Sequence, residues 1–296
     1  MNARFFLQLF FILVFFGCSQ KNPSPDIPDE LVKMEKQYRS DKADSTFVKL
    51  VQAYGKNIME SESMPAKEQL LRKVITLCSE FKNTAYTEVF ETELLKVNPR
   101  ASDAKKLLEN TAMRMEDKNR PELASIFYSA LEDRFGQKDK YRYKIIAEQS
   151  DMQQYMKSGA EDVFRSPGPQ GVNIEASEKY IDLCEAFALS FPEDRMSPEY
   201  LFRASEIARA INSLPKAMSL YDWIIQYYPK SDKTASVLFM KGFILDSELS
   251  RKEEAKKVYN NFLEKYPGDS LANDVKFLLD NLGKSDQEII KGLENK

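Results

Sequence analysis

Residues 198–231 read PEYLFRASEIARAINSLPKAMSLYDWIIQYYPKS, and this stretch decides the fold class of the 296-residue chain. In its first half Leu201 and Ala208 belong to an apolar stripe at helical spacing, and in its second half Ala217 and Tyr221 do the same. Each half therefore predicts an amphipathic helix with one apolar face. Two such helices in succession predict a helical hairpin.

An aromatic residue followed by proline ends this hairpin and recurs at nearly constant intervals: Phe191-Pro192, Tyr228-Pro229 and Tyr266-Pro267. The prolines are 37 and 38 residues apart, which is the period of a stacked helical hairpin. Proline ends each second helix because it lacks a backbone N–H and disfavours helical dihedrals in the residue before it. Ten residues after each proline comes a phenylalanine: Phe202, Phe239 and Phe277. The chain is therefore predicted to be an array of repeats.

The stretch from Pro198 to Ser231 resembles a tetratricopeptide repeat. The eight signature positions of that family are occupied without a gap by Leu201, Ala204, Ser205, Ala208, Ala217, Tyr221, Ile224 and Pro229. The next unit, from Ala235, matches if one extra residue lies in the turn between its two helices, and Lys241 stands where an apolar residue is usual. The resemblance implies an all-α fold, an α-solenoid of tetratricopeptide-like hairpins.

Weaker copies of the pattern precede these repeats, so we expect degenerate helical hairpins over residues 30–156. Residues 174–296 are expected to form tetratricopeptide repeats, followed by a capping helix from Asp269 to Leu282 and a C-terminal tail. Between them, residues 157–173 hold three glycines and two prolines. This composition predicts a loop that cannot continue a helix. The loop is either a flexible linker or a binding loop that uses Phe164 and Arg165.

The N-terminus carries an apolar run, residues 5–16, that ends at Gly17-Cys18. The run is short for a bilayer span and suits the core of a secretory signal. It resembles a bacterial lipoprotein signal, although Phe15 and Phe16 are unusual there. The resemblance implies a signal peptide over 1–17, lipid attachment at Cys18 and an outer membrane lipoprotein that faces the periplasm. An ordinary secretory signal and an uncleaved anchor are the alternatives. Residues 18–29 hold three prolines and predict a flexible tether.

The composition narrows the function. The chain has 43 Lys and Arg against 46 Asp and Glu, a net charge of −3, which does not favour a nucleic-acid partner. It has no histidine, which excludes Ser-His-Asp catalysis and imidazole zinc sites. We therefore expect no enzyme activity, no catalytic residue, no metal and no cofactor. Cys78 and Cys184 lie in apolar helical stripes and are predicted to be buried free thiols, with a disulfide as the alternative.

In the tetratricopeptide family the first helix of each hairpin lines a groove that binds a protein or peptide. The resemblance assigns partner binding to six residues: Phe202, Glu206, Arg209, Phe239, Phe243 and Asp246. The alternative is that these aromatic side chains complete the core of a short array.

The predicted function is a membrane-anchored protein–protein interaction scaffold of the bacterial cell envelope. The C-terminal half is similar to outer-membrane assembly lipoproteins and to periplasmic coordinators of cell-envelope constriction. An alternative is a lipoprotein that captures a ligand or glycan for a nutrient-uptake transporter through the loop at 157–173. That function needs an aromatic platform, and the one tryptophan is Trp223.

Overall fold

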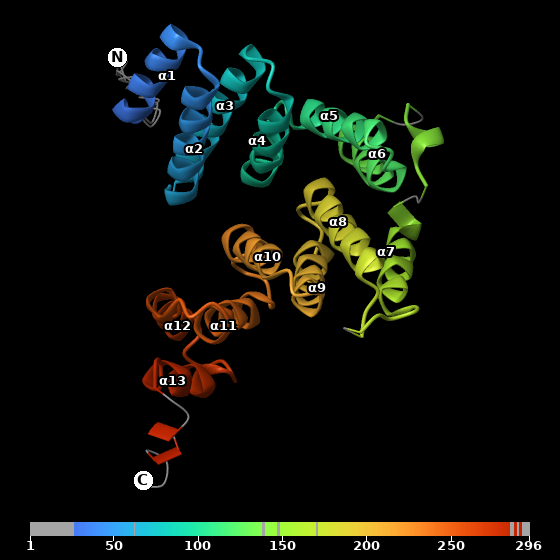
Figure 1. The fold of residues 1–296 in the computed structure, drawn as a ribbon. Coiled ribbons are helices and arrows are strands. Elements are labelled where there is room, and N and C mark those ends of the chain that lie inside the picture. Colours follow the sequence, from blue (N-terminus) through green and yellow to red (C-terminus); the bar gives the residue numbers. More distant parts are fainter. Residues whose placement is uncertain are drawn as a thin grey trace, which may run out of the picture. The chain divides into compact units, whose positions relative to one another are not determined.

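The computed structural model describes residues 27–61, 63–137, 140–146, 149–169, 171–284, 287–288 and 290–291. These residues form thirteen α-helices, a 3₁₀ turn and a π-turn, and no strand is found among them (Figure 1). The predicted all-α repeat fold is confirmed. The predicted signal peptide, Cys18 and most of the predicted tether lie outside the described residues.

The chain divides into two compact units after Lys73. The first unit contains α1 (Asp29–Asp41), α2 (Asp44–Glu60) and the first part of α3 (Met64–Glu80). α1 packs against α2, and the rings of Tyr38 and Phe47 lie with their centroids 5.1 Å apart. Leu31 and Tyr54 are fully buried. This unit therefore has an apolar core of its own.

The second unit, from Val74, contains the end of α3 and ten further helices. They are α4 (Thr84–Val97), α5 (Ala104–Asp117), α6 (Pro121–Phe135), α7 (Gln149–Phe164), α8 (Ile174–Ser190), α9 (Met196–Ala210), α10 (Leu214–Tyr227), α11 (Thr234–Phe243), α12 (Lys252–Lys265) and α13 (Ala272–Asp280). From α7 to α13 each helix packs against the next one in the chain. The second unit is thus a stack of helical hairpins, and α13 is the expected capping helix with slightly shorter bounds.

Each hairpin turns through one residue in the left-handed backbone conformation. The six described non-glycine residues with positive φ all lie between an odd-numbered helix and the even-numbered helix that follows it: Lys42, Lys82, Asn119, Ser166, Asn212 and Ser250. In three of these turns the next N–H donates to a carbonyl five residues back: Asn83 to Cys78 at 2.9 Å, Arg120 to Met115 at 2.8 Å and Ser213 to Ala208 at 2.7 Å. The turn geometry therefore recurs where the residue type does not.

The even-numbered helices bury a tyrosine in five of the six hairpins: Tyr54, Tyr128, Tyr180, Tyr221 and Tyr259. Ala217 and Ala255, one helical turn before Tyr221 and Tyr259, are also fully buried. Close approach of two helices at an alanine leaves a space that the tyrosine ring fills. Tyr221, which the sequence placed in the apolar stripe of its helix, is therefore buried, and Tyr259 is buried at the equivalent position of the next hairpin.

The extra residue of the second repeat lies inside its first helix, so the prediction that it lies in the turn is wrong. α11 continues as a π-turn, η2 (Ile244–Glu248), in which the Leu249 N–H donates to the Ile244 carbonyl at 3.0 Å. Ser250 then takes the left-handed conformation that Asn212 takes in the preceding hairpin. A widened helical turn absorbs one residue, so the connection between the helices keeps its length.

The predicted loop at 157–173 is also partly wrong, because α7 continues to Phe164. Met156 and Val163 are fully buried and extend the apolar stripe of this helix. A Cβ added at Gly159 would lie 3.2 Å from side-chain atoms of Leu183 and Tyr180. Glycine is therefore used here for close packing of α7 on α8, and only residues 165–173 form the connection.

Within the region of predicted degenerate hairpins, α4 leaves one of its apolar residues, Val89, exposed. Cys78 and Cys184 are free and buried, as predicted. Burial raises the pKa of the Cys78 thiol to about 11 and also raises the pKa of Cys184, which keeps both thiols protonated and unreactive. None of the helices in the described part of the chain has the length and apolar character needed to cross a membrane.

Candidate protein-binding surface

The six predicted binding residues lie on α9, α11 and η2 and are all partly exposed. We call this set, Phe202, Glu206, Arg209, Phe239, Phe243 and Asp246, the first-helix face. The odd-numbered helices present it because their other sides pack on the even-numbered helices through residues such as Leu201, Ala208 and Leu238, which are buried. All six side chains therefore lie on the partly exposed side of the hairpins.

On α9 the charges of the first-helix face are already paired. Arg209 Nη1 lies 3.1 Å from Glu206 Oε2, and the Tyr221 hydroxyl donates to Glu206 Oε1 at 3.0 Å. With Ala210 and Glu248, this pair borders a depression of about 300 Å³. Arg209 is thus held in place by Glu206, which is itself held by a buried tyrosine.

Phe202 on α9 carries a cation over its ring. Lys233 Nζ lies 5.6 Å from the ring centroid, and it also pairs with Glu199 Oε2 at 2.9 Å. A cation above an aromatic face is attracted by the ring quadrupole. The interaction joins α9 to the start of the next hairpin and leaves Phe202 half-buried.

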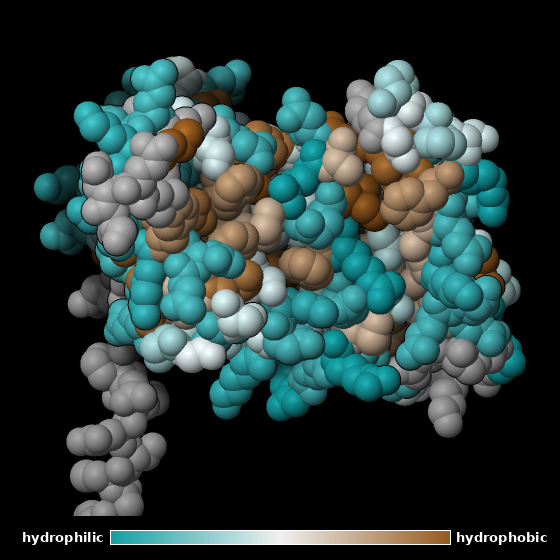
Figure 2. Space-filling view, turned by 90° about the horizontal axis from the view of Figure 1, so that it is seen from below, coloured by the Kyte–Doolittle hydropathy of each residue, from teal (hydrophilic) through white to brown (hydrophobic). Residues whose placement is uncertain are grey.

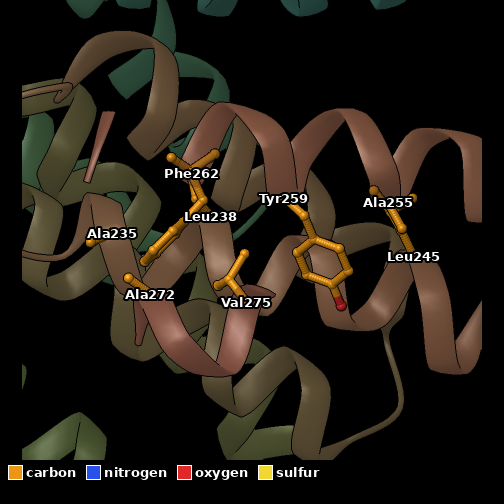
Figure 3. Close-up of a cluster of buried hydrophobic side chains, with 8 residues drawn as sticks. All are labelled: Ala235, Leu238, Leu245, Ala255, Tyr259, Phe262, Ala272 and Val275. Atoms are coloured by element: carbon orange, nitrogen blue, oxygen red, sulfur yellow. The ribbon is translucent and has the colours of Figure 1, made fainter. Parts of the chain in front are cut away.

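On α11 the two phenylalanines of the face lie together. The rings of Phe239 and Phe243 are stacked with centroids 6.4 Å apart and planes 20° apart. Phe239 also packs against the buried cluster that α11, η2, α12 and α13 share (Figure 3). Phe239 therefore supports the core and is also partly exposed.

Asp246 lies in the π-turn that follows Phe243. Burial raises its pKa, and the charge of Lys252 opposes that shift. Among the described residues, no hydrogen bond or ion pair engages the Asp246 carboxylate. This half-buried acid adds a polar group to the part of the face formed by α11 and η2.

The structure extends the face to α13, through Phe277. This residue is 43% exposed and occupies the same repeat position as Phe202 and Phe239. The three residues form what we call the phenylalanine ladder. The equal spacing from the preceding prolines was the sequence signal, but Phe277 was not among the predicted binding residues. Figure 2 shows apolar side chains exposed in patches among hydrophilic ones on the side seen from below.

Trp223 does not serve as a surface platform. It is buried in α10 with Lys96 Nζ of α4 over its ring at 4.3 Å. Next to it, the Tyr227 hydroxyl donates to Glu93 Oε1 of α4 at 2.9 Å. These contacts join helices that are far apart in the sequence, so Trp223 has a packing role inside the second unit.

Other contacts support the same closure of α4 onto the later helices. Arg134 of α6 donates to the Ser190 and Pro99 carbonyls, both at 2.7 Å. Arg100 pairs with Glu193, with Nη2 to Oε2 at 2.6 Å. One half-buried arginine, Arg134, thus joins the ends of α4 and α8.

Within the part of the chain that the structure describes, no group of three or more Cys, Asp or Glu side chains could hold a metal ion. The large pKa shifts there belong mainly to buried tyrosines, such as Tyr221, whose pKa burial raises. A buried phenol with a raised pKa stays protonated at neutral pH. The arrangement of the first-helix face is suited to contact with another surface, through rings and charged edges.

Residues 236–269 match the tetratricopeptide repeat family model. This segment contains nearly all of α11, the π-turn and α12, which is the repeat with the extra residue. A search of curated proteins finds no match to the chain. The chain therefore contains a tetratricopeptide repeat within an all-helical array, and repeats of this type generally mediate protein–protein interaction.

Proposed function

We propose that this protein is a membrane-anchored interaction scaffold of the bacterial cell envelope. Its first-helix face and phenylalanine ladder bind a partner protein or peptide, and Cys18 carries the lipid that anchors it. The observation that carries this proposal is the ladder itself. Three phenylalanines at the same repeat position reach the surface on successive odd-numbered helices, although a core role alone would bury them.

The physical argument rests on area and on charge. A few residues carry most of the binding energy of an interface, and aromatic side chains are frequent among them because they bury a large area at a small cost in conformational entropy. Charged residues at the edge set the orientation of the partner and contribute less to affinity. The phenylalanine ladder combines aromatic rings with three charged residues of the same region, Asp246, Glu248 and Arg209. This combination favours a partner that presents apolar side chains to the rings.

The anchor is supported by the sequence alone. Gly17-Cys18 after the apolar run provides a small residue before a thiol that accepts a lipid, and residues 18–29 would hold the array away from the membrane. We place the protein in the outer membrane, facing the periplasm, with a role in outer-membrane protein assembly as the finer form of the proposal. Cys18→Ser should leave uncleaved precursor, and unchanged maturation with unchanged membrane fractionation would remove the anchor from the proposal.

The binding proposal is tested by capture from crosslinked membranes. Phe277→Asp changes an exposed rung of the ladder and should abolish capture of the partner, whereas Met113→Asp on α5 alters a residue of similar exposure, 50% against 43%, and should not. Both variants should keep the helical circular dichroism of the parent. Equal capture by both variants would move the binding surface elsewhere. Recovery of barrel-assembly proteins supports the finer proposal, and recovery of a nutrient transporter contradicts it.

A further inference from the structure

A cavity of about 730 Å³ lies between the α5–α6 turn, α7 and the start of α8. Its volume is within the range of small-molecule sites in proteins. The connection 165–173, longer than the other turns inside the hairpins, contributes Arg165, Ser166 and Asn173 to its wall. No residue of the first-helix face or the ladder lines it. The cavity is therefore a separate feature, found where the repeat pattern is interrupted.

The charged side chains that line this cavity face opposite charges. Arg165 Nη1 lies 2.7 Å from Asp162 Oδ1, and Lys179 Nζ lies 2.7 Å from Glu175 Oε1. The third carboxylate of the wall, Glu122, lies 3.6 Å from Arg120 Nε. A protein usually recognises an ionic ligand through a side chain of opposite charge that has no ion-pair partner until the ligand binds. Here the wall supplies matched pairs, which offer donors and acceptors but little net charge.

Neutral polar groups of the wall stand beside an aromatic ring. Tyr155 of α7 is half-buried, and burial is the main reason that its pKa is raised. Its hydroxyl, the Ser158 and Ser166 hydroxyls and the Asn119 amide have no hydrogen-bond partner among the described side chains. These groups can donate and accept at once. Leu183 and Tyr180 add an apolar floor.

We propose that this cavity binds a neutral, hydroxyl-rich ligand of the saccharide class. A sugar ring has an apolar C–H face that packs against an aromatic ring and a rim of hydroxyls that both donate and accept. Tyr155 supplies the ring, and the hydroxyls, the amide and the two ion pairs supply the rim. An uncharged ligand leaves both ion pairs intact, whereas a charged one would have to compete with Asp162 or Lys179 for its partner.

The test uses the purified mature chain and saturation-transfer NMR with neutral probes, maltotriose and N,N′-diacetylchitobiose, and with charged probes, chitosan trimer and trigalacturonate. We expect binding of at least one neutral probe with a dissociation constant below about 10 mM. Ser158→Trp would fill the cavity from an exposed position of α7, and Tyr155→Ala would remove its ring. Each should weaken that binding at least about tenfold, with unchanged circular dichroism.

The matched control is Gln154→Trp, which adds the same side chain at an exposed residue of α7 that does not line the cavity. This variant should bind like the parent. Three results would each overturn the proposal: no response from either neutral probe up to about 10 mM, equal binding by Ser158→Trp and the parent, or preference for a charged probe. Because the ladder is untouched in these variants, their partner capture reports separately on the scaffold function.

Discussion

The hairpins α9–α10 and α11–α12 share one repeat pattern, but the buried tyrosine of the second helix has different neighbours in each. In the first, Ser205 is buried near the Tyr221 hydroxyl, and Glu206 accepts the hydrogen bond of Tyr221. In the second, Gly242 and Phe243 stand at these positions, and the Tyr259 hydroxyl is buried with no partner among the described residues. Both hairpins therefore bury a tyrosine ring between their helices. Whether the tyrosine hydroxyl has a hydrogen-bond partner depends on the residue that each hairpin carries at the position of Glu206 or Phe243.

A second difference concerns the backbone. α9 ends as an ordinary α-helix, whereas α11 ends in the π-turn with Asp246. The extra residue does not disturb the core. Leu245 keeps its buried position, whereas Asp246 is partly exposed and Ser247 is exposed. The second hairpin thus gains an acidic edge on its first-helix face without losing its core. Lys241, the departure from the family pattern, is explained by its ion pair with Asp222 of α10.

The largest expected effect comes from removal of the shared ring. Tyr221→Ala and Tyr259→Ala should each destabilise the second unit by about 3–5 kcal/mol, because each leaves a large cavity between helices. Urea unfolding followed by circular dichroism measures this loss. If only one substitution destabilises the protein, the two hairpins do not share the packing role that the comparison assigns to the ring.

A smaller effect separates Gly242 from Ser205. A Cβ at Gly242 would lie 2.7 Å from Tyr259 Cδ1, so Gly242→Ala should cost about 1–3 kcal/mol by overpacking. Ser205→Ala is the matched control, since it removes only a hydroxyl that donates to the Phe202 carbonyl at 2.6 Å. The expected cost of the control is below about 1 kcal/mol. Equal stability of Gly242→Ala and the parent would show that the ring of Tyr259 is not packed flat on α11.

The polar ends of the two rings predict effects of different sign. Tyr221→Phe removes a hydrogen bond to Glu206 and should cost about 1 kcal/mol. Tyr259→Phe removes a buried hydroxyl without a partner and should be neutral or stabilise the protein by up to about 1 kcal/mol. Chemical denaturation of the two variants measures the difference. A loss of stability in Tyr259→Phe as large as that in Tyr221→Phe would mean that the Tyr259 hydroxyl has a partner.

The smallest effect is expected from shortening the π-turn. Deletion of Ser247 should convert it to an α-helical turn and change stability by less than about 1 kcal/mol, because the residue is exposed and the left-handed turn at Ser250 is kept. Deletion of exposed Ala210 in α9, which has no residue to spare, is the control and should cost more. Thermal unfolding of both deletions checks this, and the reverse order would place the extra residue elsewhere.

The sequence by itself determined the class of fold and the faces of its best helices. Apolar residues at helical spacing and prolines at a 37 to 38-residue period are local signals, so they identified α9 to α12 and the buried rings of Tyr221 and Tyr259. Local periodicity is enough for this because a helix fixes which of its residues share a face. The resemblance to tetratricopeptide repeats, and not the spacing, assigned the six residues of the first-helix face.

The sequence did not reveal the left-handed turns, which use Lys, Asn and Ser without a common residue type, or the continuation of α7 through Gly159. It counted Phe277 in the repeat but did not place it in the site. These features depend on neighbours: α8 approaches Gly159 so closely that a side chain there would crowd Leu183 and Tyr180, and the exposure of Phe277 depends on how α13 packs on α12.

Composition and spacing therefore determined that the chain is a helical array without histidine chemistry. Only the tertiary structure decided that α4 closes on Trp223 of α10, that the charges of Glu206 and Arg209 are paired, and that a cavity opens beside the connection 165–173. The physical reason is the sequence separation of the residues that interact. Helix formation and termination depend on residues within a few positions of each other, whereas burial, pairing and cavities depend on side chains that the fold brings together from distant parts of the chain.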